Sequence, residues 1–303
     1  MELQGIYTVL VTPFDQENGL DEKGLRKNIQ RQLEANVDGI VALGTTGETP
    51  TLKSKEKERI IEIVIEEVGG KIPVVIGTGS YSTEKTIEDT LIAQNYGADA
   101  VLVVTPYYNK PTQEGIYRHF KTVANSTRLP LILYNHPGRV IQNIQLETLQ
   151  RLMDIETIIG VKETAGSVSQ MMEIIHLARC YRPEFKIVSG DDALTLPLIA
   201  MGGHGVFSVV SNLIPEQMKA LVHTALSGNI TLACAMHYQL FPLFQGANIE
   251  TNPIPIKTAM NLWGQPAGGC RLPLCEMSLS NRQKLEVILN QIEATMHFSQ
   301  GVN

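Results

Sequence analysis

Eight short apolar runs, separated by longer amphipathic stretches, constrain this sequence more than any other feature. The stretches between them carry apolar residues at helical spacing, as at Leu25, Ile29 and Leu33 within 21–36, and again within 55–68. Nearly continuous apolar strands joined by helices are typical of a parallel sheet covered on both faces. The runs lie at Ile6–Val11, Gly39–Leu43, Val74–Gly77, Ala100–Val104, Leu131–Tyr134, Ile158–Val161, Lys186–Ser189 and Gly205–Val209.

Eight such units favour a closed (β/α)8 barrel, the TIM barrel, over an open doubly wound sheet. A dinucleotide-binding fold is disfavoured because Gly77-Thr78-Gly79 is not followed by the third glycine of GxGxxG. Beyond about residue 215 the pattern is mainly helical, with a loop at Asn252–Pro255. We therefore predict an α/β chain in two regions: a barrel with the catalytic site at 1–225, and a C-terminal helical region at 226–303 packed on it.

Composition disfavours several classes of partner. The chain has 303 residues, of which 43% are hydrophobic and 18% charged, as in ordinary globular proteins. A net charge of −6 without a Lys- or Arg-rich stripe disfavours nucleic acid and anionic membranes. No signal-like segment or membrane span is recognisable, so we expect a cytoplasmic protein. The four cysteines lack CxxC spacing and are expected to be free thiols.

Lys162 is the most conspicuous candidate for chemistry. It directly follows the run Ile158–Val161, and active sites of such barrels lie at the carboxyl ends of the strands. Apolar surroundings penalise a charged amine, and a neutral amine adds to a ketone to give an iminium ion that serves as an electron sink. Two structural alternatives stay open: a lysine that extends its charge to solvent, or an ion pair with Glu163.

Three hydroxyl-bearing residues at other strand ends are candidates for proton transfer around Lys162. Tyr134 ends one run and Tyr108 follows another, so either phenol could carry a proton, with Thr45 as a relay between them. Singly, each has a common structural alternative, either a packed aromatic ring or a turn threonine. Their occurrence together at strand ends favours the catalytic interpretation.

Anion binding is suggested at two further strand ends. Gly44-Thr45-Thr46-Gly47 offers backbone N–H groups to a small carboxylate, or is only a strand-to-helix turn. Arg139, in a loop, could clamp a second carboxylate, although a loop arginine is commonly a solvated charge. Asp191-Asp192 is more typical of a helix N-cap than of a metal site. The histidines show no HxH or HExxH spacing, so no metal is expected.

Seven segments occur together in an order that matches a known family. They are Val11-Thr12-Pro13-Phe14, Gly44-Thr45-Thr46-Gly47-Glu48, Val104-Thr105-Pro106-Tyr107-Tyr108-Asn109, Tyr134-Asn135, Gly160-Val161-Lys162-Glu163, Gly190-Asp191-Asp192 and Gly202-Gly203-His204-Gly205. On these segments the chain resembles the dihydrodipicolinate synthase/N-acetylneuraminate lyase superfamily over nearly its whole length. The double threonine, Asn252–Lys257 and Arg271–Leu274 resemble its dihydrodipicolinate synthase branch.

The resemblance implies a specific reaction without metal or organic cofactor. Lys162 would form a Schiff base with pyruvate, and the imine itself would be the electron sink. Tyr134 would be the general acid/base, with Thr45 and Tyr108 completing a proton relay. The enamine would attack L-aspartate 4-semialdehyde, giving 4-hydroxy-tetrahydrodipicolinate for lysine and diaminopimelate biosynthesis.

The resemblance also implies substrate contacts and an assembly. Thr46 would hold the pyruvate carboxylate, Arg139 the carboxylate of the aldehyde substrate, and Phe207 would be a further substrate-binding residue. Tyr108 would reach the site from a neighbouring subunit, which implies a homo-oligomer, expected as a dimer of dimers. The other partners would be small-molecule substrates only.

One departure from the family pattern concerns the aldehyde. The synthases usually read Val-Pro-Ser/Gly-Arg-Thr-Gly after the Tyr134-Asn135 pair, whereas this chain reads His136-Pro137-Gly138-Arg139-Val140-Ile141. An alternative is therefore another Schiff-base pyruvate aldolase or lyase for a sugar-derived 2-keto acid, resembling N-acetylneuraminate lyase or 2-keto-3-deoxygluconate aldolase. A catalytically silent barrel is a third hypothesis, opposed by the retained lysine, tyrosines and threonine.

A second departure concerns regulation. Lysine-inhibited synthases place histidines, an asparagine and a glutamate around the bound lysine at the dimer interface. The corresponding positions here are Ser54, Lys57, Tyr81 and Lys85. A cation at Lys85, where a carboxylate would meet the ammonium group of the ligand, replaces attraction with repulsion. We predict that L-lysine does not inhibit this protein.

Overall fold

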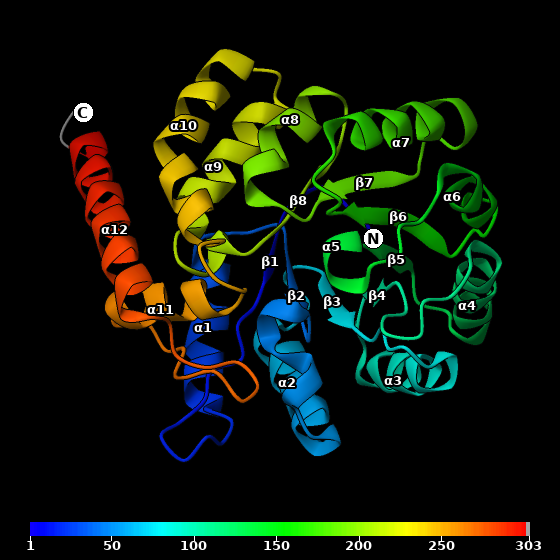
Figure 1. The fold of residues 1–303 in the computed structure, drawn as a ribbon, viewed down its shortest axis with the longest axis horizontal. Helices are drawn as coiled ribbons and strands as arrows, with labels where there is room; N and C mark the ends of the chain where they lie inside the picture. The colour runs from blue at the N-terminus through cyan, green and yellow to red at the C-terminus, as the bar shows by residue number, and fades with distance from the viewer. Residues whose placement is uncertain (301–303) are drawn as a thin grey trace.

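A computed structural model describes residues 1–300, with side chains through residue 294, and confirms the predicted (β/α)8 barrel. Within this range eight parallel strands close in the order in which they follow one another along the chain (Figure 1). The last three residues of the predicted C-terminal region lie outside the described residues. The strands are β1 (Gly5–Val9), β2 (Gly39–Ala42), β3 (Val74–Gly77), β4 (Ala100–Val104), β5 (Leu131–Asn135), β6 (Ile158–Glu163), β7 (Lys186–Ser189) and β8 (Gly205–Ser208).

Helices surround the strands, and the last of them extend to one side of the barrel (Figure 1). α12 packs against α10 and α11 there. The predicted division at 225/226 falls at the end of α9 and stays a prediction. The helices are α1 (Glu22–Glu34), α2 (Ser54–Val68), α3 (Thr83–Tyr96), α4 (Gln113–Ser126), α5 (Pro137–Val140), α6 (Leu146–Met153), α7 (Val168–Tyr181), α8 (Thr195–Ala200), α9 (Pro215–Leu226), α10 (Ile230–Gly246), α11 (Ile254–Leu262) and α12 (Leu279–Gln300), with short 3-10 turns η1 (Thr45–Gly47), η2 (Thr49–Thr51), η3 (Asp192–Leu194) and η4 (Val210–Asn212).

Local sequence signals explain where several helices begin and end. The N-cap side chains of Asp21, Ser82 and Thr112 each accept a hydrogen bond from a backbone N–H in the first turn of α1, α3 and α4. Gly69 and Gly97 end α2 and α3 in the left-handed conformation that glycine adopts without strain. These signals fix the helix ends next to the strands that carry the site.

The strand ends differ from prediction at two functionally important places. β5 continues to Asn135 and β6 to Glu163, because the ladder pairs Asn135 with Glu163 and Glu163 with Ser189. The prediction ended β6 at Val161 because an apolar pattern stops at the first charged residue. In the structure Lys162 and Glu163 are both buried and belong to the strand. Conversely, Leu43 was expected in β2 but leaves the strand with a φ of 56°.

The barrel interior forms a small core of its own, distinct from the larger core between strands and helices. It includes Tyr134, Val188 and Phe207, which lie near the carboxyl ends of β5, β7 and β8. Side chains therefore fill the barrel below the mouth, as is usual for this fold. The interior core consists of Leu3, Tyr7, Val9, Val41, Val75, Ala100, Leu102, Ile132, Tyr134, Val188 and Phe207.

Two segments were assigned incorrectly from sequence. Arg139 was expected in a loop, but it lies in α5, a single turn that begins at Pro137, a favoured first position of a helix. The predicted loop at Asn252–Pro255 ends at Pro253, because Ile254 and Pro255 already belong to α11. No helix among the described residues is both long and apolar enough to span a membrane.

Candidate active site

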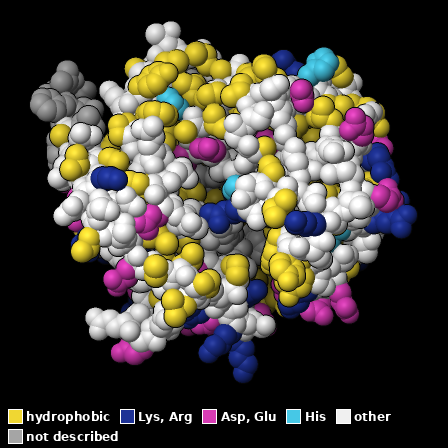
Figure 2. Space-filling model, in the orientation of Figure 1, with side chains coloured by type: hydrophobic (Ala, Val, Ile, Leu, Met, Phe, Trp, Pro, Cys, Tyr) yellow, Lys and Arg dark blue, Asp and Glu magenta, His cyan; other side chains and the backbone are white. Residues whose placement is uncertain are grey.

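A cavity of about 270 Å³ opens at the carboxyl ends of β2 to β5. Figure 2 shows this face of the molecule hollowed near its centre, with a basic side chain in the hollow. Thr45, Tyr134 and Arg139, three of the predicted site residues, line the cavity together with Val140 and Tyr107. The structure thus brings residues from three separate strand ends to one place.

Lys162 lies in the barrel mouth against aromatic rings. Its side chain is 5% exposed, and Nζ lies 4.1 Å from the ring centroid of Tyr134 and 5.9 Å from that of Phe207. Tyr134 is its direct neighbour in the ladder between β5 and β6. Among the described residues Nζ has no hydrogen bond or ion pair, so the amine is free to react.

The structure contradicts an ion pair between Lys162 and Glu163. The Glu163 carboxylate accepts from Nδ2 of Asn135 at 2.9 Å, from Nε2 of Gln170 at 3.2 Å and from the backbone N–H of Ala165 at 2.6 Å. Successive side chains of a strand point to opposite faces, so Glu163 lies outside the barrel when Lys162 lies inside it. Burial raises the pKa of Glu163, and its hydrogen bonds oppose that rise.

Gly190, part of the Gly190-Asp191-Asp192 motif, leaves space for Lys162. A Cβ atom at this position would lie 2.5 Å from Cε of Lys162 and 2.0 Å from Oγ1 of Thr164. Asp191 accepts from the backbone N–H of Ala193 at 2.9 Å, which confirms its predicted role as an N-cap. Among the described residues no group of three His, Cys, Asp or Glu side chains is arranged to hold a metal ion.

The aromatic candidates separate into two sets. Tyr134 and Phe207 are buried beside Lys162, and Phe207 packs on Tyr7 with ring centroids 5.2 Å apart. Tyr108 is 91% exposed, so in a single chain its ring is directed to solvent. Tyr107, which the sequence argument did not single out, lines the cavity and packs edge-on against Tyr81.

The turn after β2 carries Thr45 and Thr46. These residues form η1, and the N–H of Glu48 closes it on the backbone oxygen of Thr45 at 3.1 Å. Thr46 is buried, and its Oγ1 accepts from Nδ2 of Asn252 at 3.0 Å. The turn therefore depends on a residue more than two hundred positions away in the sequence.

Left-handed backbone conformations at residues other than glycine concentrate at the same edge of the barrel. Among the described residues, five of the seven lie in the loops after β2, β4 and β5, at Leu43, Glu48, Tyr108, Lys110 and Ile141. Such conformations cost free energy and persist only when the surrounding structure enforces them. Their clustering at the carboxyl ends of the strands is typical of a functional site.

Two residues near the site were given no role by the sequence argument. Asn252 contacts Thr46, and its backbone oxygen accepts from Nη2 of Arg139 at 3.3 Å. His136 lies 5.8 Å from the Tyr134 ring, with Nδ1 buried and without a hydrogen-bond partner among the described residues. Burial, and to a smaller extent the cations of Arg139 and Lys162, lower the pKa of His136 to about 4, so the ring is neutral. Only the departure of His136 from the family pattern was a signal for its importance.

Of the four positions that correspond to a lysine site, Lys57 and Lys85 line the same cavity, whereas Ser54 and Tyr81 do not. Lys57, Lys85 and Asp89 line it, and Nζ of Lys85 is 3.0 Å from Oδ1 of Asp89 and 3.1 Å from Oε2 of Glu88. The hydrogen bond to Asp89 raises the pKa of Lys85, which keeps this side chain cationic.

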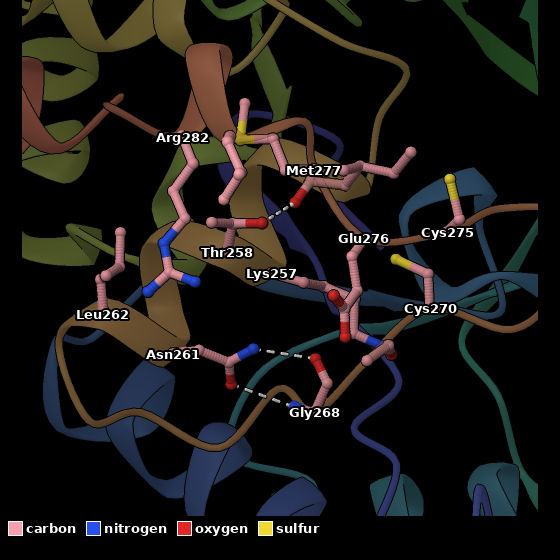
Figure 3. Close-up of a pocket in the computed structure, with 13 residues that line it drawn as sticks. Lys257, Thr258, Asn261, Leu262, Gly268, Cys270, Cys275, Glu276, Met277 and Arg282 are labelled. Carbon is pink, nitrogen blue, oxygen red and sulfur yellow. Dashed lines mark hydrogen bonds between the residues drawn. The ribbon is translucent and has the colours of Figure 1, made fainter. Parts of the chain in front are cut away.

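A second cavity, of about 310 Å³, lies between α11, α12 and the segment 268–279 (Figure 3). The side chain of Asn261 and the backbone of Gly268 exchange two hydrogen bonds along its wall. Lys257 also borders it, and its ammonium group already donates to Glu48 and to the backbone oxygens of Thr12 and Gly269. Thr45, Tyr134 and Arg139, which line the first cavity, do not line this one.

Comparisons with known proteins agree with the geometry. The model of the dihydrodipicolinate synthetase family matches residues 2–292. The 4-hydroxy-tetrahydrodipicolinate synthase of Protochlamydia amoebophila is 57% identical over 292 residues, covering 96% of this chain and 97% of that protein. The protein of the same name from Methanocaldococcus jannaschii is 47% identical over 290 residues, covering 95% and 98%. The solved structure of the 4-hydroxy-tetrahydrodipicolinate synthase from Methylacidiphilum fumariolicum SolV has a TM-score of 0.96 at 41% identity, covering 99% of both chains.

Proposed function

Because the chain belongs to the dihydrodipicolinate synthetase family, we propose that it condenses pyruvate with L-aspartate 4-semialdehyde to give 4-hydroxy-tetrahydrodipicolinate. It is an enzyme of the lyase type, and its product serves lysine and diaminopimelate biosynthesis. The observation that carries the proposal is the buried amine of Lys162, unpaired among the described residues and held between Tyr134 and Phe207 at the barrel mouth.

The chemistry begins at that amine. The nitrogen of Lys162 adds to the carbonyl carbon of pyruvate, and loss of water gives the imine. Removal of a proton from the methyl group gives the enamine, whose carbon attacks the aldehyde and forms the new carbon–carbon bond. The amino group of the aldehyde substrate then attacks the imine carbon, closes the ring and displaces Lys162. Tyr134, next to Lys162 in the ladder, is proposed to move the protons that these steps require.

The substrate carboxylates are assigned to two residues. Thr46 lies in the turn after β2 and is proposed to hold the pyruvate carboxylate, with Thr45 beside it as a proton relay. Arg139 lines the cavity and is proposed to hold the carboxylate of the semialdehyde. Phe207 is fully buried with its ring centroid 5.9 Å from Nζ of Lys162, so we propose that it packs near the amine and bounds the pyruvate site.

Assembly and location complete the proposal. Tyr108 is directed to solvent in a single chain, which supports its contribution to the site of a second subunit. We propose a homo-oligomer in which two such subunits form the smallest active unit, expected as a dimer of dimers. The net charge of −6, without a basic stripe, supports an enzyme that binds neither nucleic acid nor anionic membranes, and we propose a cytoplasmic location.

The relatives favour the synthase over the alternative lyase for a sugar-derived 2-keto acid. One observation keeps the acceptor worth testing: Val140 and Ile141 occupy the threonine-glycine step of the family, and Val140 lines the cavity. The decisive measurement is pyruvate consumption by purified protein with and without L-aspartate 4-semialdehyde, with sugar aldehydes in parallel. Rapid consumption only with the semialdehyde is the expected result.

A covalent trap tests the mechanism separately. Borohydride reduction in the presence of pyruvate should attach one pyruvate-derived group at Lys162, identified by mass spectrometry. The Lys162→Met variant should carry none. Absence of an adduct from the wild-type protein would contradict the Schiff-base mechanism and favour a catalytically silent barrel.

Regulation by L-lysine is predicted to be absent. The ammonium group of a bound L-lysine would be repelled by Lys57 and Lys85, which line the cavity. The carboxylate of Asp89, in the same lining, is already paired with Lys85. Initial rates at millimolar L-lysine should therefore equal those with sodium chloride at matched ionic strength. A saturable inhibition curve would contradict the prediction.

A further inference from the structure

Asn252, just before α11, contacts both residues proposed to bind carboxylates. Its Nδ2 donates to Oγ1 of Thr46 at 3.0 Å, and its backbone oxygen accepts from Nη2 of Arg139 at 3.3 Å. Its Oδ1 is buried and has no hydrogen-bond partner among the described residues. The side chain is thus held at the site by Thr46 rather than by a structural contact elsewhere.

We infer that Asn252 is a positioning residue that directs the hydroxyl hydrogen of Thr46 toward the carboxylate of pyruvate, an inference that rests on the proposed function. A threonine hydroxyl has one hydrogen to donate and two lone pairs that accept. Nδ2 of Asn252 donates to one lone pair, and among the described residues the hydroxyl itself donates to no acceptor. Because Thr46 is buried, its acceptor must enter the site, and a carboxylate forms the strongest such bond.

The turn that carries Thr46 is held at its other end from the same segment of chain. Nζ of Lys257 donates to Oε1 of Glu48 at 2.8 Å, to the backbone oxygen of Thr12 at 3.0 Å and to that of Gly269 at 2.5 Å. Figure 3 shows Lys257 on α11 beside the segment that carries Gly268 and Cys270. All three ammonium hydrogens are used, and both ionic side chains are buried.

Asn252 and Lys257 therefore hold Thr46 and Glu48, two residues of one short turn, from one C-terminal segment. A buried ion pair resists displacement, because breaking it would leave a charge without a partner. The fixed position of Glu48 keeps the turn in place, while Asn252 sets the direction of a single hydrogen bond. The sequence of the Asn252–Lys257 segment resembles the family, but the resemblance assigned this segment no role. We infer that the segment is part of the pyruvate site.

The substitution Asn252→Asp tests the direction of that hydrogen bond. Wild-type and variant proteins are titrated with pyruvate, the imine at Lys162 is trapped with borohydride, and the adduct is quantified by mass spectrometry. A carboxylate at residue 252 accepts the hydrogen of Thr46 and repels pyruvate. We expect the half-saturating pyruvate concentration to rise about tenfold or more, the effect of losing one charge-assisted hydrogen bond.

The aldehyde side of the site provides an internal comparison. The KM for L-aspartate 4-semialdehyde should change by less than about threefold in Asn252→Asp, because Arg139 is held by a backbone oxygen that the variant retains. The control Asn290→Asp adds the same charge at an exposed position of α12 and should leave both parameters unchanged. A wild-type half-saturation by pyruvate in Asn252→Asp overturns the inference.

A double-mutant cycle tests whether Asn252 acts through Thr46. The loss of pyruvate affinity in Asn252→Ala should shrink to less than about twofold when Thr46→Val is already present. An equal loss in both backgrounds overturns the inference.

A second pair of variants applies if the Asn252 variants do not fold, as judged by circular dichroism. Thr46→Ser should then keep pyruvate binding and Thr46→Val should lose it. Equal pyruvate binding by these two variants overturns the inference. Wild-type protein without any adduct would instead overturn the proposed function.

Discussion

Lys162 depends for its position on a residue without a side chain. A methyl group at Gly190 would overlap Cε of Lys162 and Oγ1 of Thr164. We predict that Gly190→Ala displaces the amine and lowers the rate of borohydride-trapped adduct formation with pyruvate at least about tenfold, because small displacements of reacting groups are costly. The matched control is Gly269→Ala, where nothing lies within 4 Å of the added Cβ. Trapping at the wild-type rate in Gly190→Ala would refute the steric argument.

Ile141 stores backbone strain beside Arg139. Its φ of 68° and ψ of −40° lie in a region that β-branched residues avoid, and its side chain is 66% exposed and gives little packing in return. We predict that Ile141→Gly raises the free energy of unfolding by about 1 kcal/mol, the usual cost of such a conformation reduced by the entropy of glycine. Urea denaturation measures the change. A destabilised variant would show that Ile141 makes contacts that outweigh its strain.

The candidate site residues proposed from sequence share one property. Lys162, Tyr134 and Arg139 each follow or end an apolar run, so a barrel topology alone places them at one edge. Asn252 and Lys257 lie far from Thr46 and Glu48 in sequence and contact them only through the fold. No local pattern encodes such contacts. Sequence reasoning could therefore propose candidate groups at the strand ends, but it could not find the residues that hold them.

At the scale of elements, an ion pair fastens the segment after α11 to α2. Arg271 donates to Oε1 of Glu56 at 2.7 Å and to Oε2 at 2.9 Å, and these side chains are 12% and 20% exposed. The hydrogen bonds from Arg271 lower the pKa of Glu56 to about 2 from 4.5. A carboxyl group with a lowered folded-state pKa stabilises the protein above its unfolded pKa, and this contribution is lost as the pH falls from 4.5 toward 2.

We therefore predict that Glu56→Gln is less stable than the wild type at pH 7 by about 1–2 kcal/mol, after allowance for solvent screening. The difference should narrow as the pH is lowered from 5 toward 3, since Glu56 of the unfolded wild type becomes protonated there. Urea unfolding of both proteins at several pH values measures it. Glu173→Gln, at an exposed position of α7, serves as control. A difference that stays constant down to pH 3 would contradict the assignment.

Helices and strands were predictable where a hydrophobic repeat is present. β3, β4 and β7 match their predicted limits. One error is α5, a single turn too short to show helical spacing. Others are the ends of β5 and β6, where polar Asn135 and Glu163 are paired with one another inside the protein. The predicted runs for β1, β2 and β8 were too long at their carboxyl ends, which lie at Val9, Ala42 and Ser208 rather than at Val11, Leu43 and Val209, and β1 begins at Gly5 rather than at Ile6. Buried polar networks interrupt the apolar pattern without interrupting the strand.

For the whole molecule, the central prediction is that one subunit completes the site of another. Lys162→Met lacks the nucleophile and Tyr108→Phe lacks the proposed relay hydroxyl, so each variant alone should be nearly inactive. Unfolding and refolding the two together gives mixed dimers. In each mixed dimer, one of the two sites combines an intact Lys162 with an intact Tyr108 from its partner. Random pairing makes about half of the dimers mixed, so about a quarter of all sites should become active.

The control is refolding of each variant by itself, which should restore nothing. Activity of the mixture equal to the sum of the two separate variants would show that Tyr108 acts within its own chain or does not act at all.

The architecture itself was predictable because eight repeated units admit few closed arrangements. The surface proposed to join subunits was not predictable from a repeat, because exposed residues such as Tyr108 follow none.

The contact between Lys257 and Glu48 also sets an order in time. Glu48 leaves the ribosome 209 residues before the lysine that neutralises it. After β8 has been made and before Lys257 is made, a nascent barrel has every strand but must keep the carboxylate of Glu48 hydrated, since an unpaired charge is expensive to bury. The turn proposed to bind pyruvate can therefore reach its final form only late in translation. A barrel released early would have its nucleophile but no finished active site.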